Sequence, residues 1–199
     1  NSTELFFLNR IIKDGFLIAN IKLKFDENGN IKEDYQINGF IKNGKFNFLN
    51  QLNTNNLNLN FDISKNKYFL TEVSAEINDV KFLSPLIEIN EKKNLFSVKG
   101  KILTNEKEFD IKQLSLIFPI LLKNQNIEKA RFTSENNISF NFSKKLKLND
   151  LNIKSKINLE QLVVKNSFID LKPYLPALKE VINFENHKIT INYDKDKLD

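Results

Sequence analysis

The sequence holds few residues with which to build a catalytic or metal site. His187 is its only histidine and cysteine is absent, so neither a thiolate metal site nor a multi-histidine site can form. A Ser-His-Asp triad would also have to use His187, which we interpret as an ordinary turn residue between Asn186 and Lys188. Carboxylates are numerous, but they fall mostly in expected turns and on polar strand faces, and no pair stands out. We therefore expect a protein that is not an enzyme and carries no cofactor or metal.

An acidic stretch at 26–30, Asp-Glu-Asn-Gly-Asn, has some of the composition of a calcium-binding loop. Its spacing does not fit that loop, because the glycine comes too early and the position of the closing glutamate is apolar. Asn-Gly supplies the positive φ angles of a tight hairpin. The stretch therefore predicts a turn between two strands.

The charge pattern argues against a nucleic-acid partner. The net charge is +5, but lysine is interspersed with acidic residues and arginine occurs only at Arg10 and Arg131. Nucleic-acid surfaces favour clustered charge and arginine side chains. No apolar run approaches the roughly 18 residues that a membrane-spanning helix needs.

Strict alternation is the dominant pattern. In residues 57–63, Leu57, Leu59, Phe61 and Ile63 share one face, and asparagine and aspartate occupy the other, which is typical of a β-strand. The same pattern predicts strands over 17–25, 35–41, 46–48, 69–77, 80–89, 96–102, 138–142, 151–159 and 189–193. Between them we expect turns at 42–44, 64–67 and 144–145, a turn or bulge at 78–79, and an interruption at Pro85.

Helical spacing is limited to short stretches. Thr3 as N-cap and Gly15 as stop frame a predicted helix over 3–14. A second is predicted over 111–123 despite Pro119, and a third over 173–182 with Pro173 in its first turn. The fold class is thus mainly β: a long twisted antiparallel meander with two or three short helices, forming one domain over 1–199 that is a fragment of a longer protein.

The apolar face of such a sheet must be covered. These helices are too few and short, which leaves two alternatives. One is an open groove whose concave apolar face holds lipid, and the other is a closed β-sandwich or barrel acting as an adhesion or protein-binding module. In the groove, the expected lining residues are Leu57, Leu59, Phe61, Ile63, Val73, Ile77, Val98, Ile138, Phe140, Phe142, Ile153, Ile157, Ile189 and Ile191.

Several stretches resemble the AsmA-like family, and in particular its large YhdP-type members. They are the turn at 26–30 with Phe25 and Ile31 on either side, Tyr-Gln-Ile-Asn-Gly at 35–39, the alternating stretch at 57–63, and residues 182–189 after the third predicted helix. The resemblance implies a repeating β-groove in the periplasm of a Gram-negative bacterium, anchored to the inner membrane through regions outside this chain. It also implies phospholipid as the partner, carried toward the outer membrane, and no catalytic residues.

Overall fold

The computed structural model describes residues 12–32, 34–48, 52–77, 80–93, 95–110, 127–145, 147–165, 181–194 and 197–198, and these are almost entirely β-strand. The strands are β1 (Ile12–Lys22), β2 (Gln36–Phe48), β3 (Leu52–Ser64), β4 (Lys67–Ile77), β5 (Val80–Lys92), β6 (Leu95–Asp110), β7 (Ile127–Ser143), β8 (Leu148–Lys165), β9 (Val181–Asp194) and β10 (Lys197–Leu198). The mainly β expectation is therefore confirmed.

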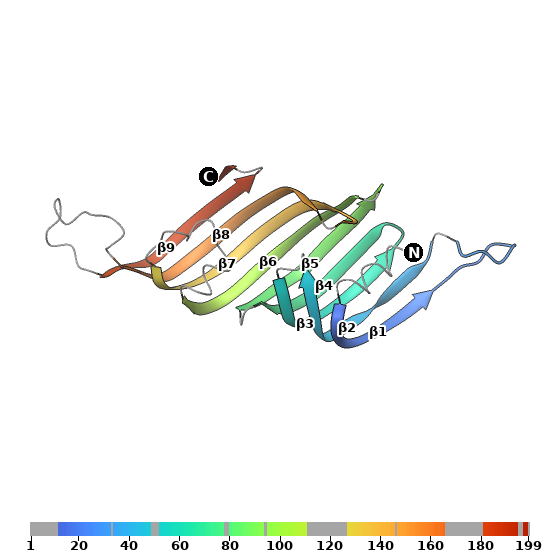
Figure 1. The fold of residues 1–199 in the computed structure, drawn as a ribbon, viewed down its shortest axis with the longest axis horizontal. Coiled ribbons are helices and arrows are strands. Elements are labelled where there is room, and N and C mark those ends of the chain that lie inside the picture. The colour runs from blue at the N-terminus through green and yellow to red at the C-terminus, as the bar shows by residue number, and fades with distance from the viewer. Residues whose placement is uncertain are drawn as a thin grey trace. The chain divides into compact units, whose positions relative to one another are not determined.

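The ten strands form a single open sheet in which every strand lies beside its neighbours in the sequence (Figure 1). This arrangement is an antiparallel meander, with β1 and β10 as its two ends. The alternative of a closed sandwich or barrel is not what the sheet adopts. Short hairpins make the meander possible, because each strand can turn directly into the next.

Three of the expected turns are confirmed. In the first, the Gly29 amide donates to the Asp26 carbonyl and the isolated bridge between Phe25 and Ile31 closes the hairpin. The second turn follows β3, with Asn66 at φ +58°, and the third lies at residues 144–145 after β7. Asparagine suits the second turn, because its short polar side chain tolerates the left-handed backbone conformation.

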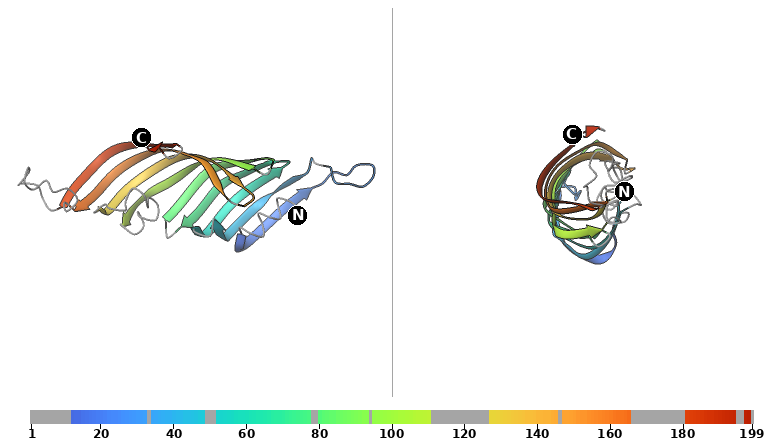
Figure 2. Two further views of the ribbon diagram at one scale, coloured as in Figure 1. Left: turned by 45° about the horizontal axis from the view of Figure 1, so that its top comes forward. Right: turned by 90° about the vertical axis from the view of Figure 1, so that its left-hand side faces the viewer.

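The chain divides into two compact units. The first unit contains residues 1–103, 136–154 and 191–199, and the second contains residues 104–135 and 155–190. Within the first unit, β2, β3, β4 and β5 are complete and lie side by side in both views of Figure 2. We describe each unit separately below.

Four consecutive strands of the first unit carry a backbone irregularity. Residues with positive φ are Gly15 in β1, Asn43 in β2, Asn56 in β3 and Glu72 in β4. The registers of the pairs β1–β2, β2–β3 and β3–β4 shift beside them, which marks β-bulges. A bulge bends its own strand and increases the local twist. It also moves the following side chains to the other face, so the alternation of each strand changes phase.

Two of these irregularities correct the sequence interpretation. Residues 42–44 lie inside β2 instead of turning the chain, because the positive φ of Asn43 makes a bulge there. In β4, the predicted shared face of Phe69, Thr71 and Val73 is wrong, since the phase changes at Glu72. Phe69 lies opposite Asp62, and Tyr68 lies opposite Ile63, so Tyr68 is the residue on the apolar face.

Pro85 does not break β5, which runs without a gap from Val80 to Lys92. Proline is tolerated here because Glu72, its neighbour across the pair, is itself the irregular residue of β4. Residues 78–79, predicted as a turn or bulge, lie outside the described residues.

The helix predictions are not supported where the structure describes the chain. The predicted helix at 3–14 is wrong at its end, because Ile12 and Asp14 belong to β1, and Gly15 is a bulge residue and not a helix stop. The predicted helix at 173–182 is likewise wrong at Val181, which begins β9. The remaining parts of both, and all of 111–123, lie outside the described residues.

Candidate functional site

The most extensive chemical feature of the first unit is an apolar face that begins on β2 and β3. Ile41, Leu57, Leu59 and Phe61 form a buried cluster in which each side chain is at most 8% exposed. Five half-buried side chains pack against this cluster, namely Ile37, Ile63, Leu70, Val73 and Ala75. The face therefore extends across β2, β3 and β4.

A second cluster continues the same face toward β7. Tyr68, Phe96, Val98 and Phe142 are buried together, and the rings of Phe96 and Phe142 stack with centroids 4.9 Å apart. Ile63 packs against both clusters, so the two form one surface. The half-buried Ile87 and Ile89 of β5 and Phe140 of β7 complete its outer members.

Gly39 lets the largest side chain of the first cluster lie flat on the sheet. Gly39 of β2 is directly opposite Phe61 of β3. A Cβ atom at position 39 would come within 2.8 Å of the Phe61 ring and would also meet the backbone of Ile18 and Ala19. The absence of a side chain at Gly39 therefore makes room for the Phe61 ring over β2.

The opposite face of these strands carries polar side chains that bond across the sheet. The Asn58 side-chain oxygen accepts from the Asn43 backbone amide at 3.1 Å, and its side-chain nitrogen donates to the Asn56 carbonyl at 2.8 Å. Asn56 in turn donates to the Glu76 carboxylate at 2.7 Å, and Asn60 donates to that of Glu72 at 2.8 Å. The asparagines thus serve the backbone and side chains of the bulge residues.

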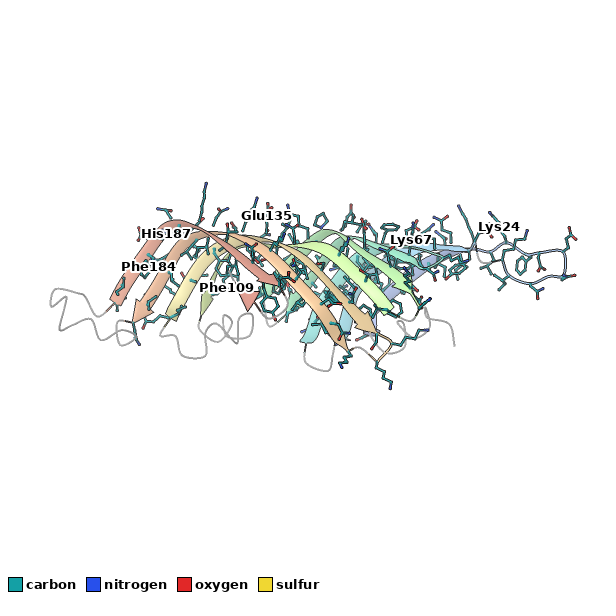
Figure 3. The ribbon with its side chains drawn as sticks, turned by 90° about the horizontal axis from the view of Figure 1, so that it is seen from above. Lys24, Lys67, Phe109, Glu135, Phe184 and His187 are labelled. Atoms are coloured by element: carbon teal, nitrogen blue, oxygen red, sulfur yellow. The ribbon has the colours of Figure 1, made fainter. Side chains whose placement is uncertain are left out.

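The second unit repeats the contrast between two faces, with hydroxyl groups added to its apolar side. Phe109 of β6 is fully buried and its ring lies 4.7 Å from that of Phe132 in β7. In β8, alternate residues Ile157, Leu159 and Val163 are buried. Figure 3 shows Phe109 and the exposed Glu135 on opposite sides of this part of the sheet.

Three hydroxyl residues are buried in the second unit: Thr104, Ser134 and Ser155. The hydroxyl groups of Thr104 and Ser134 are hydrogen-bonded at 2.8 Å. A buried hydroxyl needs such a partner, since leaving it unsatisfied costs roughly 1–3 kcal/mol. The pair therefore makes one polar contact on an otherwise apolar surface.

Ionisable groups lie at the surface and form pairs of ordinary strength. The Lys165 ammonium lies 2.8 Å from the Glu128 carboxylate, which raises the pKa of Lys165 through a hydrogen bond and attraction between the charges. The Lys24 ammonium likewise holds the pKa of Asp34 below its usual value. Such exposed pairs contribute little to stability.

Neither a catalytic nor a metal-binding cluster emerges from the residues that the structure describes. His187 is exposed, and its ring centroid lies 6.2 Å from that of Phe184 on the same strand (Figure 3). Within the described ranges, no three histidine or acidic side chains are grouped so that they could hold a metal ion. The same ranges contain no helix with the length and apolar character to cross a membrane.

The structure gathers most of the residues expected to line the apolar surface. Leu57, Leu59, Phe61, Val98 and Phe142 are members of the two buried clusters, and Ile63, Val73 and Phe140 pack against them. Half-buried positions elsewhere in the first unit are Ile77, Ile138, Ile153 and Ile191. In the second unit Ile157 is buried, whereas Ile189 is 39% exposed.

Sequence reasoning missed several buried members of these surfaces. Tyr68 was missed because the phase change at Glu72 cannot be read from alternation alone. Phe109 and Phe132 were missed because no regular alternation was recognised in 105–110 or 127–136. A pair of phenylalanines on consecutive long strands is the signal that could have found them.

Comparison with known proteins adds no relative: no family model, curated protein or solved structure matches this chain.

Proposed function

We propose that this chain binds phospholipid along the apolar face of its sheet. The observation that carries the proposal is the continuous apolar surface of the first unit, which runs from Ile37 in β2 to Phe142 in β7 on an open sheet. Its outer members are half-buried and retain area for a ligand. The polar face, with its asparagine and carboxylate pairs, is the side that suits water.

The bulges would give this surface the form of a groove. Bulges in β1 to β4 bend their strands and increase the twist at neighbouring positions. If the bends add up across the first unit, the apolar face becomes the hollow side. The sheet would then enclose acyl chains between its strands and leave the headgroup in water.

The dimensions and energies suit an acyl chain. A strand of 13 residues, the length of β3, spans about 43 Å at about 3.3 Å per residue, whereas one leaflet of a bilayer core is about 15 Å thick. Each buried methylene contributes about 0.8 kcal/mol, so a phospholipid with two chains gains roughly 20 kcal/mol before the costs of binding. Contacts with isoleucine, leucine and phenylalanine are not directional, so a bound lipid can slide along the face.

The wider setting of the proposal follows the resemblance to the AsmA-like family. In that setting the chain is a β-groove segment of a longer protein that is anchored to the inner membrane and crosses the periplasm of a Gram-negative bacterium. Phospholipid would pass along it toward the outer membrane, with a part in outer-membrane biogenesis. The sheet then provides binding and guidance and performs no chemical reaction.

A matched pair of substitutions tests the proposal. Ile89→Glu places a carboxylate on the half-buried apolar face beside Tyr68. Asn90→Glu adds the same charge at an exposed position opposite Lys67. We expect both variants to fold and Ile89→Glu alone to bind less phospholipid from vesicles. Equal lipid binding by two folded variants would contradict the proposal.

A further inference from the structure

β1 differs from the interior strands because both of its faces expose large apolar side chains. On one face, Phe16 is 58% exposed and Ile18 is 44% exposed. On the other, Leu17 is 42% exposed and Ile21 is 61% exposed. Phe16 lies near Phe40 of β2, with ring centroids 6.3 Å apart, but this contact leaves most of its surface in water.

β1 is also an edge of the sheet. Among the described strands it pairs only with β2, through residues such as Ala19 opposite Gly39. Soluble proteins usually protect an edge strand with charge, proline or a short length. β1 has 11 residues, no proline, and an uncharged apolar centre from Phe16 to Ile21. An edge of this kind favours pairing with another strand.

We propose that β1 pairs antiparallel with β1 of a second copy of this chain, with Ala19 on the two-fold axis. A two-fold interface brings the same surface of both copies together, so it must be self-complementary. With Ala19 opposite Ala19, Leu17 of one copy lies opposite Ile21 of the other. The same register places the Asp14 carboxylate opposite the Lys24 ammonium, and Phe16 opposite Lys22.

Neighbouring registers are less complementary. Moving the axis to Asn20 places Asp14 opposite Asp26, so that two negative charges face each other. Moving it to Ile18 places Ile21 opposite Gly15, which has no side chain to pack against it. Charge and packing therefore both favour Ala19 at the axis.

The pairing would extend the apolar face over two copies. Leu17, Ala19 and Ile21 lie opposite Ile41, Gly39 and Ile37 of β2, which places them on the face of the first buried cluster. In the dimer this face would continue from the β2 of one copy, across both β1 strands, to the β2 of the other. This inference rests on the edge and its register and stands independently of lipid binding.

Cysteine substitutions test the register directly, because the natural chain contains no cysteine. In the Ala19→Cys variant the two thiols face each other across the axis, within the distance a disulfide can bridge. In the Leu17→Cys control the two thiols are four residues apart along the strands, about 13 Å, which is out of reach. On mild oxidation of the 199-residue chain, we expect a covalent dimer from Ala19→Cys at least ten times faster than from Leu17→Cys.

Sedimentation equilibrium gives a second measurement without any disulfide. We expect the unmodified chain to dimerise at micromolar concentration and Ile21→Lys to be monomeric with an unchanged melting temperature, because residue 21 is exposed and the new charge blocks pairing. Three results would each overturn the proposal. They are a monomeric unmodified chain, equal disulfide rates for the two cysteine variants, and slow amide exchange along the outer edge of β1 in a monomer, which would show that the chain itself occupies the edge.

Discussion

The Asn58 side chain of β3 accepts a hydrogen bond at 3.1 Å from the backbone amide of Asn43, the bulge residue of β2. The same side chain donates to the carbonyl of Asn56, the bulge residue of its own strand. A bulge disrupts the hydrogen-bond ladder and leaves backbone groups in need of other partners. Asn58 supplies those partners for two adjacent strands and thereby holds both bulges in place.

Replacing Asn58 should therefore loosen the bulges. For Asn58→Leu we expect unfolding in urea at lower concentration, with a loss of about 1–3 kcal/mol, because the Asn43 amide and the Asn56 carbonyl lose a partner. Asn60→Ala, on the same face, removes only an exposed contact with Glu72 and should cost less than about 0.5 kcal/mol. Equal losses from the two variants would argue against this role of Asn58.

Gly39→Ala should destabilise the first unit. The added Cβ would lie 2.8 Å from the Phe61 ring and would press on the backbone of β1, so we expect a loss of about 1–3 kcal/mol in thermal unfolding. Gly100→Ala is the control, because its nearest neighbour is the flexible Ile87 side chain at 3.1 Å, and it should cost less. A Gly39→Ala protein as stable as the unmodified chain would show that Phe61 does not pack on β2 in this way.

The hydroxyl pair of the second unit provides a stability test there. Thr104→Val keeps the shape of the side chain but removes the hydrogen bond to Ser134, so we expect a loss of about 1 kcal/mol. Thr190→Val, at an exposed position, should leave stability within about 0.5 kcal/mol of the unmodified chain. A Thr104→Val variant with undiminished stability would indicate that the pair contributes nothing.

The hairpin at 25–31 should loosen in acid. Amides of Asn30 and Asn28 donate to the Asp26 carboxylate and, together with the Asn30 side chain, hold its pKa below the ordinary 3.8. A lowered pKa in the folded state means that the ionised carboxylate stabilises the hairpin above pH 3.8 and that this stability is lost as pH falls through the lowered value. The Phe25 and Ile31 amide resonances should shift over that range.

Asp26→Asn is the control for the acid transition. Asparagine can still accept the amide hydrogen bonds but does not titrate, so the hairpin should persist and the pH dependence of those resonances should disappear. An identical acid transition in Asp26→Asn would assign the effect to another group.

Alternation predicted the strands because the period of two is local and each strand buries one face. It failed where a single backbone angle changes the phase, at Asn43 and Glu72, since a bulge has no alternation of its own. Gly15 was misread for a related reason: glycine after an apolar stretch suits a helix end as well as a bulge. Residues 57–63 were predicted correctly because their bulge lies before them, at Asn56.

The candidate site could be predicted in part for the same reason. Leu57, Leu59 and Phe61 follow one another in a regular strand, so sequence reasoning placed them on one face, as the structure has them. Their contact with residues far along the chain, such as the link from Ile63 to Phe142's cluster, depends on the order of strands in the sheet. A sequence does not contain that order in any local pattern.

Counting bound phospholipid tests the central claim most directly. The unmodified chain, folded and free of detergent, is incubated with vesicles of phosphatidylethanolamine and phosphatidylglycerol, separated from them by flotation, and weighed by native mass spectrometry. We predict that the apolar face retains at least one phospholipid per chain and that Ile89→Glu retains less. A folded chain that emerges with no bound phospholipid would contradict the account.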